Sequence, residues 1–258
     1  VYSAAEFATD AHQLVAQIIA RGRTPLLVGG TMLYFKAFLD GLASMPGADP
    51  AIRARISAQA NAHGWPHIHE QLAQVDPQAA ARIHPHHSQR LSRALEVYQA
   101  SGVTLTQWHR SGGADINDRY RVVQLAICPV ERAILHQRIA RRFELMMEAG
   151  LLEEVRGLWR RPDLHAGLPA MRAVGYRQLW QHLEDECTLD DAVKNAIAAT
   201  RQLAKRQLTW LRKWSHLGWI YTDHAGNIAP TGLPEEGGDW IGERPLGLAL
   251  NYLARRPL

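Results

Sequence analysis

The sequence predicts an α/β protein with a parallel sheet, interrupted by a helical insertion. Three observations support this. Residues 3 to 39 follow the order helix, short strand, helix. Residues 42 to 117 have helical spacing and lie between two Gly-rich linkers, whereas strand character returns at 120–128 and 218–223. We therefore expect a core formed by residues 1–41 and 118–223, an insertion domain at 42–117, and a loose tail at 224–258.

The first elements of the predicted core have clear boundary signals. Ser3 followed by Glu6 forms a capping box, and apolar residues at helical spacing continue to about Arg21. The next stretch, "PLLVGGTMLYFKA", predicts a short buried strand at 25–28 and a helix at 31–39. The Gly-Gly-Thr turn between them has two interpretations: an anion site at a helix N-terminus, or a tight turn capped by Thr31.

The remaining elements follow from similar signals. Asp49 and Pro50 are typical of an N-cap and a first helical position, and helical segments with breaks at "HGWP", "VDP" and "HPHH" continue to about residue 108. Pro129 begins a long helix that Gly150 divides, and a further helix is predicted from Leu189 to Trp214. "GWIYTD" at 218–223 predicts the last strand.

Composition excludes several classes of protein. The chain has 258 residues, and no apolar stretch approaches the roughly 20 residues that a membrane helix needs. Two cysteines do not form a disulfide framework, so a reducing cytoplasm is expected. His84, His86 and His87 are interrupted by Pro85 and have no cysteine nearby, so no residue of this chain is expected to bind a metal ion.

The helix predicted at 189–214 is amphipathic in an informative way. Its apolar residues share one face, expected to be core, and its cations share another; the apolar face holds Val193, Ala196, Leu203, Ala204, Trp210, Leu211 and Trp214, and the basic stripe holds Lys194, Arg201, Lys205 and Arg212. The stripe is either a solvated surface or a contact for a polyanion. Arginine sets on other segments favour the second interpretation; they are Arg90 with Arg93, Arg138 with Arg141 and Arg142, and Arg172 with Arg177 beside Tyr176.

Six motifs in order resemble one known family. They are "LLVGGTMLYFKAFLDGL", "ADPAIRARI", "VDPQAAARIHPHHSQRLSRALEVY", "LHQRIARRFELMM", "MRAVGYRQLW" and "ATRQLAKRQLTWLRKW". This set, from about Tyr2 to Trp219, is similar to the tRNA dimethylallyltransferases, also called tRNA isopentenyltransferases. The resemblance implies a P-loop-NTPase-like parallel-sheet core with a helical insertion that contacts tRNA. It also implies transfer of a dimethylallyl group from dimethylallyl diphosphate to N6 of adenosine 37, in the tRNA anticodon stem-loop.

The resemblance also assigns site residues. Thr31 and Arg142 are the expected catalytic residues, and Gly29, Gly30 and Arg142 are expected to bind the diphosphate. Thr31 is further expected to line the meeting point of base and diphosphate. The expected tRNA contacts, besides Thr31, are Arg53; Gln89, Arg90, Leu91, Ser92 and Arg93; Arg172, Ala173, Val174, Gly175, Tyr176 and Arg177; and Lys205, Arg206, Gln207, Leu208, Thr209, Trp210, Leu211 and Arg212.

The sequence departs from the family pattern in one respect. It contains neither a glycine-rich P-loop ending in Gly-Lys-Thr or Gly-Lys-Ser nor the Asp-Ser motif whose Asp is the proposed base. We therefore expect an N-terminally incomplete core, with the nucleotide-binding (ATP-type) motif and the Mg²⁺ ligands upstream of Val1, and weak or no activity. The alternative is a non-catalytic tRNA-binding remnant. A nucleotide kinase-like enzyme is disfavoured by the missing P-loop. A cytoplasmic monomer is expected.

Overall fold

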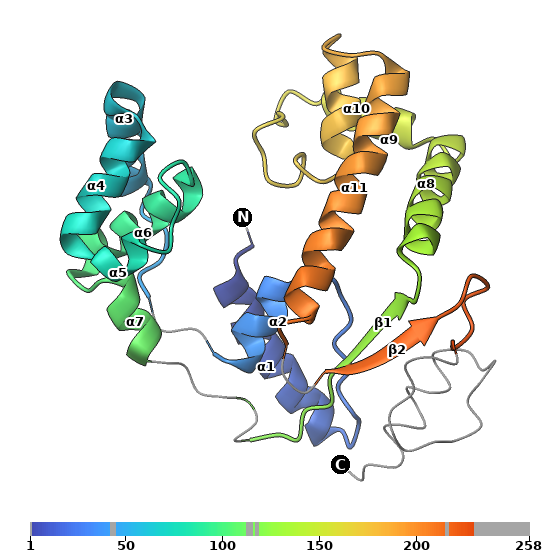
Figure 1. The fold of residues 1–258 in the computed structure, drawn as a ribbon, viewed down its shortest axis with the longest axis horizontal. Helices are drawn as coiled ribbons and strands as arrows, with labels where there is room; N and C mark the ends of the chain where they lie inside the picture. Colours follow the sequence, from blue (N-terminus) through green and yellow to red (C-terminus); the bar gives the residue numbers. More distant parts are fainter. Residues whose placement is uncertain (1, 42–44, 112–115, 117–118, 215–216, 230–258) are drawn as a thin grey trace. The chain divides into compact units, whose positions relative to one another are not determined.

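The computed structural model describes residues 2–41, 45–111, 116, 119–214 and 217–229 (Figure 1). These residues are mostly helical, with one two-stranded parallel sheet. The chain divides into two compact units: Tyr2–Val28 with Leu33–Tyr120, and Gly29–Met32 with the described residues from Arg121 on. In the part of the chain that the structure describes, no helix is both long and apolar enough to span a bilayer.

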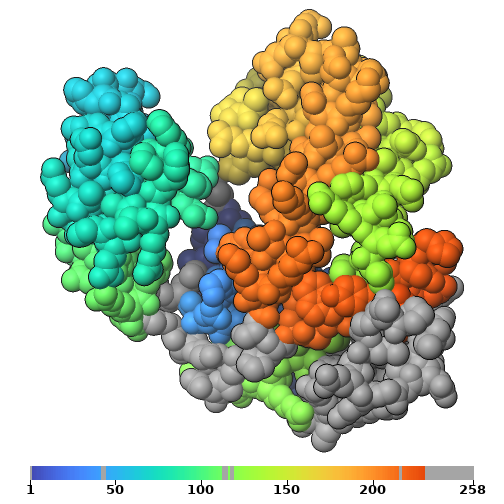
Figure 2. All heavy atoms as spheres, viewed as in Figure 1, coloured from blue at the N-terminus to red at the C-terminus, as the bar shows by residue number. Residues whose placement is uncertain are grey.

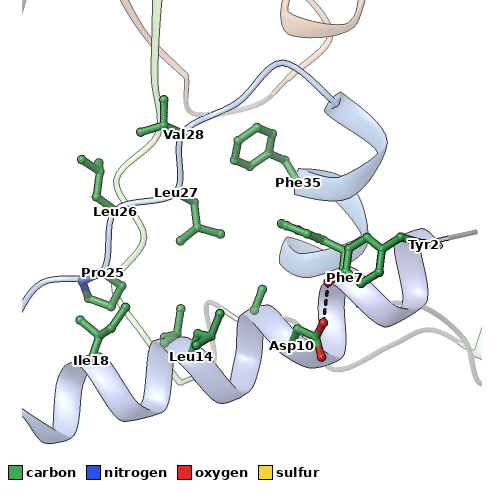
Figure 3. A pocket seen from close by; sticks show the side chains of 12 residues that line it. Tyr2, Phe7, Asp10, Leu14, Ile18, Pro25, Leu26, Leu27, Val28 and Phe35 are labelled. Carbon is green, nitrogen blue, oxygen red and sulfur yellow. Dashed lines mark hydrogen bonds between the residues drawn. The ribbon is translucent and has the colours of Figure 1, made fainter. Parts of the chain in front are cut away.

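The first unit begins with α1 (Ala4–Ala20) and also holds most of α2 (Met32–Leu39). The predicted capping box at α1 is confirmed: the Ser3 hydroxyl accepts from the Glu6 amide, and the Glu6 carboxylate accepts from the Ser3 amide. Between the two helices lies an apolar groove, into which Leu27 projects (Figure 3). Phe7 and Tyr34 stack at a centroid distance of 4.7 Å and hold α2 against α1.

The strand predicted at 25–28 is wrong. Those residues are extended but belong to no strand, and their backbone groups make no hydrogen bond to any residue that the structure describes. Leu26 and Val28 are 78% and 84% exposed rather than buried. The physical reason is that a strand is defined by its hydrogen-bonded neighbour, which a local apolar run does not supply.

Five further helices form a bundle in the first unit. They are α3 (Pro50–His63), α4 (Trp65–Val75), α5 (Pro77–Ala80), α6 (Ser88–Ser101) and α7 (Leu105–Ser111). The breaks between α3 and α6 fall where the sequence predicts them, and Asp49 caps α3 through the amides of Ala51 and Ile52. The core of the bundle includes the fully buried Ile56, Ile68, Leu72 and Leu91. Asp76 caps α5 and also accepts from the amide and hydroxyl of Thr106, which joins α7 to the bundle.

The second unit contains the sheet and four helices. Its elements are β1 (Leu125–Pro129), α8 (Arg132–Glu148), α9 (Leu151–Trp159), α10 (Tyr176–Leu183), α11 (Leu189–Leu211) and β2 (Gly218–Thr222). β1 and β2 pair in parallel from Leu125–Gly218 to Pro129–Thr222, which confirms a parallel arrangement at small scale. Gly150, at φ +95°, separates α8 from α9 as predicted, in a backbone conformation that favours glycine.

The apolar face expected on α11 is only partly buried. Its N-terminal half packs with α9 and α10 through Ala192, Val155 and Trp180, which are buried. Leu203 and Trp210, in the C-terminal half, are 39% and 40% exposed. This corrects the expectation that the whole apolar face is core. Helical spacing predicts which residues share a face, but the packing partner decides how much of that face is covered. In Figure 1, α11 continues well beyond α10.

The loose tail expected from residue 224 does not hold for the residues that the structure describes there. The chain turns after β2, because the Asp223 amide donates to Asn227 O at 2.8 Å and the Ala229 amide donates to Tyr221 O at 2.9 Å. Ile228 and Ala229 are buried. Residues 230–258, the remainder of the predicted tail, lie outside the described residues.

Candidate functional site

The Gly-Gly-Thr turn is exposed and is tied to α11. Gly29, Gly30 and Thr31 precede α2 and are all open to solvent. Gln207, on α11, donates from Nε2 to the Gly30 carbonyl oxygen at 2.8 Å. A Cβ atom at position 30 would lie 2.3 Å from that Nε2, so any larger residue there would displace the Gln207 side chain. The turn and α11 belong to the same compact unit.

The C-terminal half of α11 presents cations to solvent. Lys205, Arg206 and Arg212 are exposed, and no ion pair is formed by them with any residue in the described ranges. Trp210, on the apolar face of the same helix, is 40% exposed, so an aromatic surface is also open to solvent there. α11 is seen at the surface of the molecule in Figure 2. Of the remaining residues of the predicted segment, Gln207, Leu208 and Leu211 are half-buried, whereas Thr209 is exposed.

In the N-terminal part of α11, the residues of the basic stripe differ in burial and in their partners. Lys194 pairs with Asp190 one turn earlier, so its charge is partly neutralised. Arg201 is half-buried, and its Nε has no hydrogen-bond partner among the residues that the structure describes. Burial and the charges of Arg132 and Arg201 hold the pKa of His136, on α8, below its ordinary value. His136 is therefore neutral at pH 7 and adds no charge to this region.

Neighbouring arginines on α8 differ in their partners. Arg138 donates from Nη2 to Asp223 O at 2.9 Å, and Arg141 pairs with Glu144 at 3.3 Å and Glu148 at 3.4 Å. Arg142 is exposed and makes no hydrogen bond or ion pair with another described residue. Of the three, Arg142 is the one without a hydrogen-bond or ion-pair partner among the described residues. Its role in holding the diphosphate, which the family resemblance implies, stays a prediction.

The predicted contact at 172–177 combines exposed and buried residues. Arg172, Ala173 and Arg177 are exposed, whereas Val174 and Tyr176 are half-buried. Gly175 is buried, and its amide donates to Gln178 Oε1 at 2.9 Å at the start of α10. The Tyr176 hydroxyl donates to Glu154, so this ring is held by α9 rather than free to stack on a base.

In the helical bundle, two predicted tRNA contacts surround a buried carboxylate. Glu96 has no exposed surface, and it accepts from Arg53 Nε at 2.8 Å and Nη2 at 3.1 Å and from Arg93 Nη1 at 2.9 Å. Arg93 also donates to Pro46 O at 2.7 Å, and the Asp49 amide donates to Glu96 at 2.8 Å. The side chains of Arg53 and Arg93 are nevertheless 52% and 35% exposed, so each retains N–H groups for an outside ligand.

The neighbouring predicted contacts on α6 are divided by burial. Gln89 and Arg90 are exposed and Ser92 is half-buried. Leu91 is fully buried, and its side chain packs in the bundle core, so it cannot serve as a side-chain contact in this conformation. The family motif marks a continuous segment, whereas helical geometry turns one residue in every three or four toward the core.

The acid sensitivity of the bundle follows from its two buried carboxylates. Burial alone would raise the pKa of Glu96, but the hydrogen bonds from Arg53 and Arg93 outweigh it, and the pKa lies below the ordinary 4.5. Burial would likewise raise the pKa of Asp76, but the hydrogen bonds from Thr106 and Ala79 bring it below 3.8. Both groups therefore stabilise the fold while they are ionised.

We expect the contribution of Glu96 and Asp76 to the free energy of unfolding of the bundle to be complete above about pH 5 and to fall as the pH decreases through about 4.5 and below. The stabilisation is complete above the unfolded pKa values and is lost as the folded carboxylates are protonated. Urea unfolding between pH 7 and 3, followed by amide exchange in α3 and α6, measures this. Equal stability at pH 6 and at pH 3 would contradict the roles of both carboxylates.

Two contacts, one in each compact unit, were not predicted from the sequence. Glu96 was missed, although a charged residue within the otherwise apolar run Ala94–Val97 is a signal that a buried polar contact is needed. Gln207 was predicted only as a tRNA contact, and its bond to Gly30 spans 177 residues. No local sequence pattern predicts a hydrogen bond between residues so far apart in the chain.

The described residues do not fit a magnesium site. Mg²⁺ prefers carboxylate and hydroxyl oxygens in octahedral geometry. The turn offers the Thr31 hydroxyl and backbone oxygens, and within the described ranges no three His, Cys, Asp or Glu side chains come together as ligands. None of these residues is therefore assigned a role in holding a metal ion.

Comparison with known proteins identifies the family. The model of the IPP transferase family matches residues 1–214. The tRNA isopentenylpyrophosphate transferase of Bacillus halodurans is 33% identical, with a TM-score of 0.56, over 86% of this chain and 67% of its own. Two more distant structures share the fold. The tRNA delta(2)-isopentenylpyrophosphate transferase of Staphylococcus epidermidis is 23% identical, with a TM-score of 0.56, over 99% of this chain and 77% of its own.

The second of the two more distant structures is a eukaryotic dimethylallyltransferase acting on tRNA, which is 20% identical to this chain with a TM-score of 0.72. The match covers 100% of this chain and 63% of that protein. The family match and the resemblance of the six motifs agree over nearly the same residues. The chain therefore belongs to the IPP transferase family, which is the family of the tRNA dimethylallyltransferases.

Proposed function

We propose that this chain acts in the transfer of a dimethylallyl group from dimethylallyl diphosphate to N6 of adenosine 37 of tRNA. The observation that carries the proposal is the hydrogen bond between Gln207 and Gly30. It brings a turn suited to an anion together with a helix that exposes cations and an aromatic ring. One segment suits the allylic diphosphate, and the other suits the tRNA backbone.

The reaction asks mainly for electrostatic help. N6 of the adenine attacks the allylic carbon, so a C–N bond forms while the C–O bond to the diphosphate breaks. The diphosphate leaves with the electron pair, and the proton that N6 gives up passes to water, because the expected Asp base is not in this sequence. Because negative charge accumulates on the leaving group, a cation placed there lowers the barrier. We assign that cation to Arg142, with Gly29 and Gly30 allowing the diphosphate to approach the backbone and Thr31 lining the meeting point with the base.

The tRNA is proposed to bind through exposed groups of both units. On α11 these are Lys205, Arg206, Thr209 and Arg212, with Trp210 available to stack on an unpaired base. Arg172 and Arg177 contribute from the same unit, and Arg53, Gln89, Arg90 and Arg93 contribute from the bundle. The target base must leave the stack to be modified, at a cost of a few kcal/mol that these contacts offset.

We further propose that the 258-residue chain alone turns over weakly or not at all. The sequence contains no Gly-Lys-Thr or Gly-Lys-Ser and no Asp-Ser, so neither the expected diphosphate cradle nor the expected base is present in it. The P-loop-type core, its nucleotide and Mg²⁺ binding, the insertion at 42–117, and a cytoplasmic monomer remain predictions. The second candidate function, tRNA binding without catalysis, is supported by the same exposed cations of α11.

A prenylation assay with this chain, tRNA and dimethylallyl diphosphate tests whether the chain turns over, and a binding assay tests whether it holds tRNA. Mass spectrometry of the digested tRNA detects an added dimethylallyl group, and filter binding at several salt concentrations measures tRNA affinity. Salt-dependent binding with little or no product is the expected result. Robust prenylation would show that the missing motifs are dispensable. Absence of tRNA binding would contradict the proposed function.

The role of Arg142 can be separated from that of its neighbour. Arg142→Ala should weaken the binding of dimethylallyl diphosphate by about tenfold or more, because a charge-assisted contact is lost, while tRNA affinity changes less than twofold. Arg141→Ala is the matched control, since Arg141 is equally exposed but already paired with Glu144 and Glu148. Isothermal titration with the diphosphate measures the effect. Equal losses in the two variants, or no diphosphate binding by the parent chain, would contradict the assignment.

A further inference from the structure

The Gly-Gly-Thr turn is hydrogen-bonded to α11 through one backbone group, the Gly30 carbonyl, and the donor is Gln207. From residue 25 to residue 31, the Gly30 carbonyl is the only backbone group with a hydrogen bond to another residue in the described part of the chain. Leu26, Val28, Gly29, Gly30 and Thr31 are all exposed. An exposed segment with so few contacts opens easily, because neither packing nor a hydrogen-bonded ladder restrains it. The Gln207 bond is therefore the main restraint on the position of the turn.

The other end of the bond lies within the proposed tRNA-binding helix. Lys205 and Arg206 precede Gln207, and Thr209 and Trp210 follow it; all four are exposed. Gln207 itself is half-buried and directs its amide toward Gly30. Any ligand that fixes this part of α11 also fixes the donor of the bond.

We infer that Gln207 is a positioning residue: its amide fixes the Gly-Gly-Thr turn, and with it Thr31, relative to the tRNA-binding helix. This inference rests on the proposed function for its purpose, but the contact itself is independent of it. The sequence predicted that Gln207 contacts tRNA. In place of that role, Gln207 transmits the effect of bound tRNA to the turn. Removal of the amide should loosen the turn without weakening tRNA binding.

Gly30 gives a second way to disturb the same contact. The backbone conformation of Gly30 is not one that disfavours other residues, so alanine is compatible with it, but the added Cβ would displace the Gln207 amide. Gly30→Ala should therefore break the bond from the opposite side. Once Gln207 is itself shortened to alanine, nothing remains for the Cβ to displace. The effects of the two substitutions should be strongly non-additive.

The test measures NMR backbone order parameters at residues 29–31 of the full chain. Gln207→Met keeps length and charge but removes the donor, and should lower these order parameters from about 0.85 toward about 0.6, the change from rigid to flexible backbone. Gln202→Met, at an exposed glutamine of the same helix, is the matched control and should change nothing. Gly30→Ala should lower the order parameters in the parent chain and add little in the Gln207→Ala background.

A second arm tests the coupling. Saturating tRNA should raise the order parameters of residues 29–31 of the parent chain but not of Gln207→Met, while the dissociation constant for tRNA changes less than twofold. Additive effects of Gly30→Ala and Gln207→Ala, or unchanged order parameters in Gln207→Met, would overturn the inference. A tenfold loss of tRNA affinity in Gln207→Met would make Gln207 a direct tRNA contact instead. If the parent chain binds no tRNA, the proposed function fails, and the order parameters of the single and double variants still decide whether Gln207 holds the turn.

Discussion

Replacement of Glu96 by alanine is expected to lower the free energy of unfolding of the helical bundle by about 2–4 kcal/mol. The substitution leaves the Asp49 amide without its acceptor and leaves Arg53 and Arg93 without their shared carboxylate. The loss should lie below that of a fully buried ion pair, because both guanidinium groups are partly exposed and water can solvate them.

Urea unfolding monitored by amide exchange in α3 and α6 measures this change. The matched control is Glu70→Ala in the same bundle, where the carboxylate side chain is 75% exposed and its nearest cationic partner is His67 at 3.8 Å. That variant should lose less than about 0.5 kcal/mol. A loss below 1 kcal/mol for Glu96→Ala would mean that the carboxylate does not organise the bundle. The loop at Pro46 should also exchange faster, because Arg93 no longer holds it.

Neutralising the exposed cations of α11 is expected to have the largest effect on tRNA binding. A chain carrying Lys205→Gln, Arg206→Gln and Arg212→Gln should bind tRNA about 10- to 100-fold more weakly near physiological salt. If each residue neutralises one phosphate, the slope of log affinity against log salt should also become shallower by about 2 to 3. Fluorescence anisotropy of labelled tRNA at several salt concentrations gives both quantities.

The control must change net charge equally, because overall charge alone affects the attraction of a polyanion. Arg21→Gln, Arg23→Gln and Arg160→Gln serve this purpose, since all three residues are exposed and none belongs to the predicted contact. The control should keep most of the affinity and most of the salt slope. Equal behaviour of the two triple variants would show that the cations of α11 are only a solvated surface.

Features determined by a few neighbouring residues were predictable from the sequence. The Ser3 capping box, the Asp49 cap and the break at Gly150 all depend on local geometry. The strand expected at 25–28 depends on a partner, and the burial of Leu203 and Trp210 depends on what packs against them. Neither partner can be read from the segment itself.

In the candidate site, too, local features were predictable from the sequence and contacts between distant segments were not. The exposed arginines and the turn carry residue types that are recognisable in one dimension, so Arg142 and Thr31 could be named from motifs. The Arg53–Glu96–Arg93 cluster and the Gln207–Gly30 bond join segments that are remote in the chain. Such contacts decide which members of a motif face a ligand and which hold the protein together, as Leu91 illustrates.

The pairing of β1 with β2 also has a consequence for the order of folding. Leu125 faces Gly218, and every helix from α8 to α11 lies between them in the chain. Closing so long a loop costs entropy that local contacts must first offset, so a parallel pair of this kind forms late. The α9–α11 core, whose residues are closer in sequence, should form earlier and carry Gly218 toward Leu125. The sheet is then a product of the helical assembly rather than the frame on which the helices are built.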